Sequence, residues 1–97
     1  MLVVTDAAIE RLDDMLLGVR PKAAQSLRLT RTPADRLAFG VDWEREGDQV
    51  VFSHDRAVLL IAHELSDLLE GATLDTNVRD IGRLSLRYRS VTRQAGS

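Results

Sequence analysis

Two short apolar runs lie close together in the middle of the chain, at Val50 to Phe52 and Ala57 to Ile61. The polar residues Ser53 to Arg56 separate them, and this pattern is typical of a β-hairpin. Side chains on both faces of the ribbon are apolar, so the hairpin has to be covered on both sides. We therefore expect it in the middle of the domain and not at a sheet edge.

The alignment of this hairpin depends on its turn. A turn at Asp55-Arg56 places Phe52 opposite Leu59 on the buried face. A non-glycine residue at positive φ costs roughly 1 kcal/mol, so a turn at His54-Asp55 or a longer loop remains an alternative. With the turn at Asp55-Arg56, Phe52→Ala is expected to lower the free energy of unfolding by about 3 to 5 kcal/mol. The side chains expected to be largely buried are Val50, Phe52, Leu59 and Ile61, together with Leu37, Phe39, Leu84 and Leu86.

The rest of the chain alternates between strand and helix patterns. A short strand at 2–4 leads into a helix that Thr5-Asp6 can cap and that Gly18 and Pro21 end. A second, shorter helix over 63–70 ends at Gly71. Alternating polarity predicts strands at 26–31, 37–43, 72–76 and 83–88. The order β-α-β-β-β-β-α-β-β predicts one α+β domain dominated by sheet.

Length and composition set the outer limits. Ninety-seven residues, 44% apolar and 29% charged, predict a single domain over 1–97, with an ordered core over 1–90 and a frayed tail over 91–97. A net charge of −2 without a long basic run indicates no nucleic-acid partner. The sequence has no apolar stretch of membrane-spanning length and no signal-peptide pattern at its start, so we expect a cytoplasmic protein that binds no membrane.

The chain contains no cysteine. Disulfides, thiolate metal sites and thiol nucleophiles are therefore excluded. The chain nevertheless shows a resemblance to a known protein family.

Four segments carry that resemblance: 4–8, 37–41, the hairpin over 48–61, and 68–75, which reads Leu-Leu-Glu-Gly-Ala-Thr-Leu-Asp. Together they resemble the HesB/IscA-type, or A-type, iron–sulfur carrier family over almost the whole chain. The resemblance implies a HesB-like domain, in which one long N-terminal helix and one short helix cover a strongly bent, mainly antiparallel sheet. It also implies iron–sulfur assembly or target proteins as partners.

The sequence departs from this family where the chemistry lies. In the family, a glycine-rich turn carrying Cys-Ser-Gly and a later Cys-Gly-Cys supply three thiols that hold iron or a cluster. The resemblance puts Ala34 at the first cysteine and Ala95-Gly96-Ser97 at the other two. Neither alanine nor serine replaces a thiolate on iron. We therefore interpret the chain as a cysteine-free relative that binds no cluster and no other cofactor.

Two histidine–carboxylate pairs, His54-Asp55 and His63-Glu64, contain the components of a metal or general-base site. At about 3.3 Å per residue, the strand between them puts the two histidines roughly 20 Å apart. Ser53 beside His54 does not form a nucleophile and base either, because neighbours in a strand point to opposite faces. We predict no enzymatic activity; a small-ligand or metal-binding protein using these two pairs is the alternative.

The C-terminal strand is rich in arginine. Arg87 and Arg89 lie opposite its apolar face, where they would protect a sheet edge from aggregation or form a docking face. In the family, the first thiol loop faces the C-terminal tail. The candidate partner-binding residues are therefore Arg31, Arg36, Arg87 and Arg89.

Overall fold

A computed structural model of the chain describes residues 1–34, 36–76 and 84–88. Its elements follow the predicted order. They are β1 (Val3–Val4), α1 (Asp6–Gly18), β2 (Gln25–Arg31), β3 (Leu37–Trp43), β4 (Gln49–Ser53), β5 (Arg56–Ile61), α2 (His63–Leu68), β6 (Ala72–Thr76) and β7 (Leu84–Tyr88).

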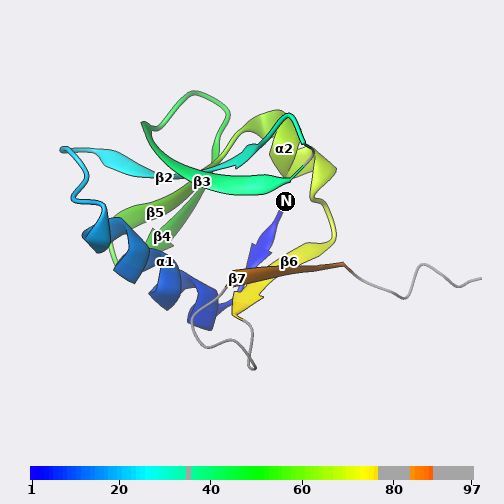
Figure 1. Ribbon diagram of the computed structural model, residues 1–97, viewed down its shortest axis with the longest axis horizontal. Coiled ribbons are helices and arrows are strands. Elements are labelled where there is room, and N and C mark those ends of the chain that lie inside the picture. Colours follow the sequence, from blue (N-terminus) through cyan, green and yellow to red (C-terminus); the bar gives the residue numbers. More distant parts are fainter. Residues whose placement is uncertain (35, 77–83, 89–97) are drawn as a thin grey trace, which may run out of the picture.

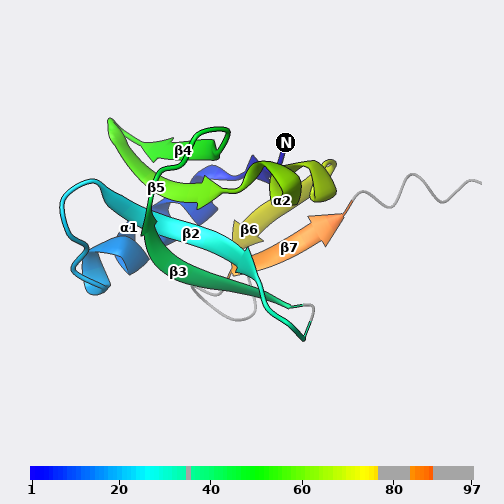
Figure 2. The same ribbon diagram turned by 90° about the horizontal axis from the view of Figure 1, so that it is seen from above.

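The strands form two sheets instead of the single bent sheet that was expected. One sheet has the strand order β3-β2-β5-β4 and the other has the order β1-β6-β7 (Figures 1 and 2). Most neighbouring strands are antiparallel, but β2 pairs with β5 and β1 with β6 in parallel. Helix α1 contacts strands of both sheets, so the main core lies between them. The fold class is mixed α+β with two sheets and two helices in the described residues.

Helix α1 begins where Thr5-Asp6 was expected to cap it. The Thr5 hydroxyl accepts a hydrogen bond from the Ala8 amide at 3.2 Å and so satisfies one of the free amides of the first turn. Ala8, Leu12 and Leu16, spaced by four residues, are fully buried. This 13-residue helix thus presents one apolar face to both sheets.

Strand β5 is the centre of the larger sheet. Val58 to Ile61 are all fully buried, as expected for a strand covered on both faces. After it, α2 spans only six residues. Leu65 within the helix and Leu69 directly after it are buried, whereas Leu68 is exposed. Gly71 follows with φ +86°, the left-handed conformation that its place after a helix predicted.

The predicted hairpin alignment was wrong. The turn is His54-Asp55, the alternative, because Ser53 pairs with Arg56 and His54 has φ +57°. A bulge between Val51 and Phe52 then shifts the register again, so that Val51 faces Leu59 and packs on the core. A one-residue shift sends side chains to the opposite face. Phe52 is consequently 56% exposed and does not belong to the core.

The placement of the outer strands also differs from expectation. Only β5 of the hairpin is central, and β4 is an edge strand. On β3, also an edge strand, Phe39 packs partly on the core but Leu37 is exposed. Val50, Leu84 and Leu86 are half-buried. The predicted frayed tail over 91–97 lies outside the described residues.

A polar contact joins the two sheets near the N-terminus. The Gln49 side chain on β4 accepts hydrogen bonds from the Leu2 amide at 3.0 Å and the Ser66 hydroxyl at 2.6 Å. Its amide nitrogen donates to the Leu2 carbonyl at 2.8 Å. One glutamine therefore fixes the start of the smaller sheet and α2 to the edge of the larger one.

Because Phe52 lies outside the core, truncating its side chain should lower the free energy of unfolding only slightly. We expect Phe52→Ala to change the free energy of unfolding by about 1 kcal/mol or less, and Leu59→Ala to lower it by about 2 to 5 kcal/mol. Urea unfolding monitored by circular dichroism measures both, with equal m-values as a check that each remains two-state. Equal losses in the two variants would contradict the observed register.

Candidate functional site

The turn between β2 and β3 is where the family resemblance places the first cysteine. The Thr32 amide donates to the Arg36 carbonyl at 2.7 Å, and the Arg36 amide donates to the Thr32 hydroxyl at 3.2 Å. Pro33 and Ala34 are exposed at its tip. The turn is therefore closed by hydrogen bonds between Thr32 and Arg36, and it presents the methyl group of Ala34 where the resemblance expects a thiol.

The four candidate arginines are not gathered into one described cluster. Arg31 and Arg36 are exposed and flank this turn on the larger sheet. Arg87 lies on β7, at an edge of the smaller sheet, and its guanidinium pairs with the Asp75 carboxylate at 2.8 Å. Arg89 lies outside the described residues.

Asp75 links Arg87 to the start of α1. Its carboxylate accepts hydrogen bonds from the Thr5 hydroxyl at 2.7 Å and from the Thr76 amide at 2.8 Å. These bonds, the one from Thr5 foremost, and the Arg87 charge lower the pKa of Asp75. Arg87 is thus oriented by a partner while its side chain remains 63% exposed.

The structure does not bring the two histidines together. His54 is exposed in the β4–β5 turn, and His63 is exposed at the first residue of α2, so the whole of β5 separates them. His63 lies 3.4 Å from the Asp67 carboxylate one helical turn away. Among the described residues no three histidine, aspartate or glutamate side chains are grouped as metal ligands would be.

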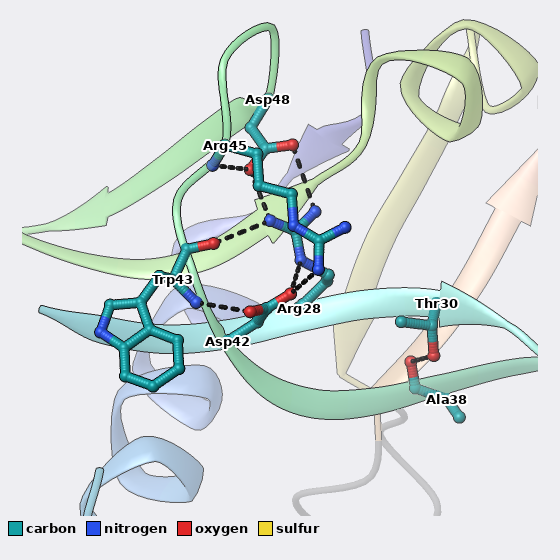
Figure 3. A network of polar contacts seen from close by, with 7 residues as sticks. All are labelled: Arg28, Thr30, Ala38, Asp42, Trp43, Arg45 and Asp48. Atoms are coloured by element: carbon teal, nitrogen blue, oxygen red, sulfur yellow. Dashed lines mark hydrogen bonds and ion pairs between the residues drawn. The ribbon is translucent and has the colours of Figure 1, made fainter. Parts of the chain in front are cut away.

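A buried arginine is the main polar feature that the sequence analysis missed. Arg28 projects from the face of β2 opposite Leu27 and Leu29, and only 7% of its side chain is exposed. Its Nη1 and Nη2 donate to the two Asp48 carboxylate oxygens at 3.1 and 2.6 Å (Figure 3). Its Nε donates to Asp42 at 2.9 Å, and Nη2 also donates to the Trp43 carbonyl at 3.1 Å.

The side chain of Asp48 is buried by this contact. Its side chain is 3% exposed, and besides Arg28 it accepts a hydrogen bond from the Arg45 amide at 2.8 Å. The hydrogen bonds from Arg28 are the largest cause of its lowered pKa. The pKa of Asp42 is lowered as well, first by the bond from the Trp43 amide and then by Arg45 and Arg28.

A signal for part of this network was present in the sequence. With Arg28 opposite Gly40, Asp42 is its diagonal neighbour on the same face of the β2–β3 pair. The Asp48 contact had no such signal, because it depends on how the β3–β4 loop folds back over the sheet.

A pocket of about 370 Å³ lies beside this network, between β2 and α2. Leucine side chains from both elements line it, and charged side chains stand around them. The lining residues are Arg28, Leu29, Thr30, Arg31, Arg45, Ala62, Glu64, Leu65 and Leu68. Arg31, a candidate partner-binding residue, therefore borders the pocket.

Solved structures with a similar fold include two proteins of iron–sulfur cluster biology. The crystal structure of IscA with the [2Fe-2S] cluster matches with a TM-score of 0.52 and 22% identity, over 92% of this chain and 84% of that one. Escherichia coli SufA, involved in biosynthesis of iron–sulfur clusters, matches with a TM-score of 0.57 and 12% identity, over 91% and 83%. The chain has a HesB/IscA-like fold. Comparisons with family models and with curated proteins gave no match.

This finding confirms the HesB/IscA-like resemblance and a mixed α+β fold, although the strands form two sheets in place of the single bent sheet that was expected. The HesB/IscA-like fold is present without a single cysteine in the chain. No described helix is long and apolar enough to cross a membrane.

We expect Arg28→Met to lower the free energy of unfolding at neutral pH by about 3 to 5 kcal/mol, because it leaves the buried Asp48 carboxylate without its cation. The pKa of Asp48 is lower in the folded state than in the unfolded state. The stability that this ion pair contributes is therefore complete above the unfolded pKa of about 4, and it is lost as the pH falls through the folded pKa. Urea unfolding at several pH values should therefore show parent and variant converging in acid.

Arg45→Met is the matched control, since Arg45 is 69% exposed and its pair with Asp42 is worth about 1 kcal/mol or less. Equal losses for the Arg28 and Arg45 variants at neutral pH would show that burial of the Arg28 pair does not matter.

Proposed function

We propose that this protein is a non-enzymatic, cytoplasmic relative of the A-type iron–sulfur carriers that binds proteins of iron–sulfur assembly, or their targets, without carrying a cluster. One observation carries the proposal: the HesB/IscA-like fold extends over nine-tenths of a chain that contains no cysteine. Folds outlast the sites that they carry, so a fold kept without its ligands is consistent with a role in binding.

We assign partner binding to Arg31 and Arg36 beside the β2–β3 turn, to Arg87 on β7, and to Arg89, which lies outside the described residues. Arg31 borders the pocket between β2 and α2, where the exposed Leu68 and the buried Leu65 supply apolar walls. A partner segment with an apolar anchor residue and nearby carboxylates fits such a surface, since anchors that fill pockets dominate binding energy. The charges around the pocket would then govern association rate and specificity.

The histidine–carboxylate alternative receives less support. Its two pairs lie at opposite ends of β5, and each histidine is exposed. A joint site would need a large movement of one pair.

The first test concerns the cluster. After anaerobic incubation with iron and sulfide followed by desalting, the protein should stay colourless and retain no stoichiometric iron, because it offers no thiolate. IscA, whose crystal structure contains a [2Fe-2S] cluster, is the positive control treated in parallel. Stoichiometric iron and a visible absorption band in the cysteine-free chain would overturn the proposal.

The second test concerns the partner. The intact chain, used as bait in native cytoplasmic extract, should capture an iron–sulfur assembly or target protein, and Arg31/Arg36/Arg87/Arg89→Ala should lose it. Quantitative mass spectrometry of the captured proteins measures both results. The matched control, Arg11/Arg20/Lys22/Arg56→Ala, removes the same charge from exposed positions elsewhere and should keep the partner.

Each variant has to melt like the parent before binding is compared. Equal loss in both variants would point to bulk charge and reject the assigned surface. A tightly bound small molecule or metal without any protein partner would instead favour the histidine–carboxylate alternative.

A further inference from the structure

The buried Arg28 guanidinium has one hydrogen-bond donor to spare. A guanidinium carries five N–H donors in one plane. Four of them are used: Nε bonds to Asp42, Nη1 and Nη2 bond to the two oxygens of Asp48, and Nη2 also bonds to the Trp43 carbonyl. The second N–H of Nη1 has no acceptor among the described residues, although only 7% of the side chain is exposed. Buried donors almost always have a partner, so this one needs an explanation.

The planar geometry of the group fixes where this donor points. Asp48 occupies the end of the guanidinium, whereas Asp42 and the Trp43 carbonyl occupy the edge formed by Nε and Nη2. The remaining N–H therefore lies on the opposite edge. Arg28 lines the pocket of about 370 Å³ between β2 and α2, and none of its three partners does. The edge with the spare donor is thus the one left to face the pocket.

Arg45 brings a second guanidinium to the same place. Its Nη2 donates at 2.8 Å to the Asp42 oxygen that also accepts from Arg28 at 2.9 Å, so the two groups lie close together (Figure 3). Arg45 also lines the pocket, and its side chain is 69% exposed. Within the described part of the chain only its Nη2 has an acceptor, which leaves Nε and Nη1 available to a ligand.

The helix side of the pocket is apolar. Leu65 on α2 is buried, and Leu68 is 57% exposed and forms an outer wall. Of the residues that line the pocket, Glu64 alone is acidic, whereas three are arginines. Guanidinium donors facing leucine side chains suit a ligand with an anionic head and a small apolar body.

We propose that this pocket binds a carboxylate attached next to an apolar side chain, as in a small carboxylic acid or in the C-terminal residue of a protein. The carboxylate accepts hydrogen bonds from Nη1 of Arg28 and from Arg45, which satisfies the spare donor, and the apolar group packs against Leu65 and Leu68. A volume of about 370 Å³ lies at the low end for ligand pockets, so it suits one such residue better than a longer segment.

The open rim favours a chain end as the source of this carboxylate. Leu68 and the Arg45 side chain remain 57% and 69% exposed, so a ligand can continue out of the pocket. Pockets for small molecules usually enclose most of the ligand surface. A C-terminal residue as ligand deepens the proposed function and rests on it, whereas the carboxylate site itself does not.

N-acetyl-leucine and its amide test the site, because they differ only in the carboxylate. In NMR titrations of the intact chain, the acid should bind with a dissociation constant of about 0.1 to 1 mM, and the amide about tenfold more weakly or less. The largest shifts should fall on the backbone amides of Leu29, Arg45 and Leu65. Equal affinity for acid and amide, no binding of either, or shifts confined to another part of the chain would overturn the proposal.

Single variants test the assigned groups. Arg45→Met should weaken binding of the acid about tenfold, and Glu64→Gln should strengthen it about two- to threefold, because it removes the acidic group of the lining. Arg20→Met, the matched control, removes an exposed arginine outside the pocket and should bind like the parent. Each variant is compared only after it melts like the parent. An Arg45→Met variant that binds as well as Arg20→Met would overturn the assignment.

The peptide acetyl-glycyl-glycyl-leucine with a free carboxylate separates the two sources. If the ligand is a chain end, this peptide should bind within about twofold of N-acetyl-leucine, because its other residues leave through the exposed rim. Binding about tenfold weaker would reject the chain end and assign the pocket to a small acid. None of these measurements uses an iron–sulfur protein, so failure of the carboxylate site and failure of partner capture are seen separately.

Discussion

The buried ion pair between Arg28 on β2 and Asp48 stabilises the larger sheet on the face that α1 does not cover. A buried guanidinium is tolerated only when its charge and its donors are satisfied, and here two carboxylates and a carbonyl do so. Because Asp48 lies at the end of the β3–β4 loop, the pair holds that loop against the sheet. Leu60, fully buried outside the main core cluster, pairs in register with Arg28 on this face. The contact thus helps β5 to be covered on both sides.

The elements that the sequence predicted well are those specified by local chemistry. The stripe of Ala8, Leu12 and Leu16, the Thr5 cap and the positive φ of Gly71 each follow from residues within one or two turns. The hairpin alignment was not predicted, because the turn lies at His54-Asp55 and a bulge after Val51 then shifts the register again. No sequence pattern marks the bulge. The division into two sheets and the edge position of β3 depend on long-range strand pairing, which alternation of polarity cannot specify. The Arg28–Asp48 pair, twenty residues apart, belongs to the same class.

The fold does not need a metal to hold the β2–β3 turn. Two hydrogen bonds between Thr32 and Arg36 close the turn, and the cross-strand pairing continues from there to Trp43. At the far end of β3, the Arg28 network fixes the strand a second time. With both ends held by bonds within the chain, the β2–β3 pair does not depend on a thiolate at its turn. This gives a physical reason why a HesB/IscA-like fold can form in a chain without thiols.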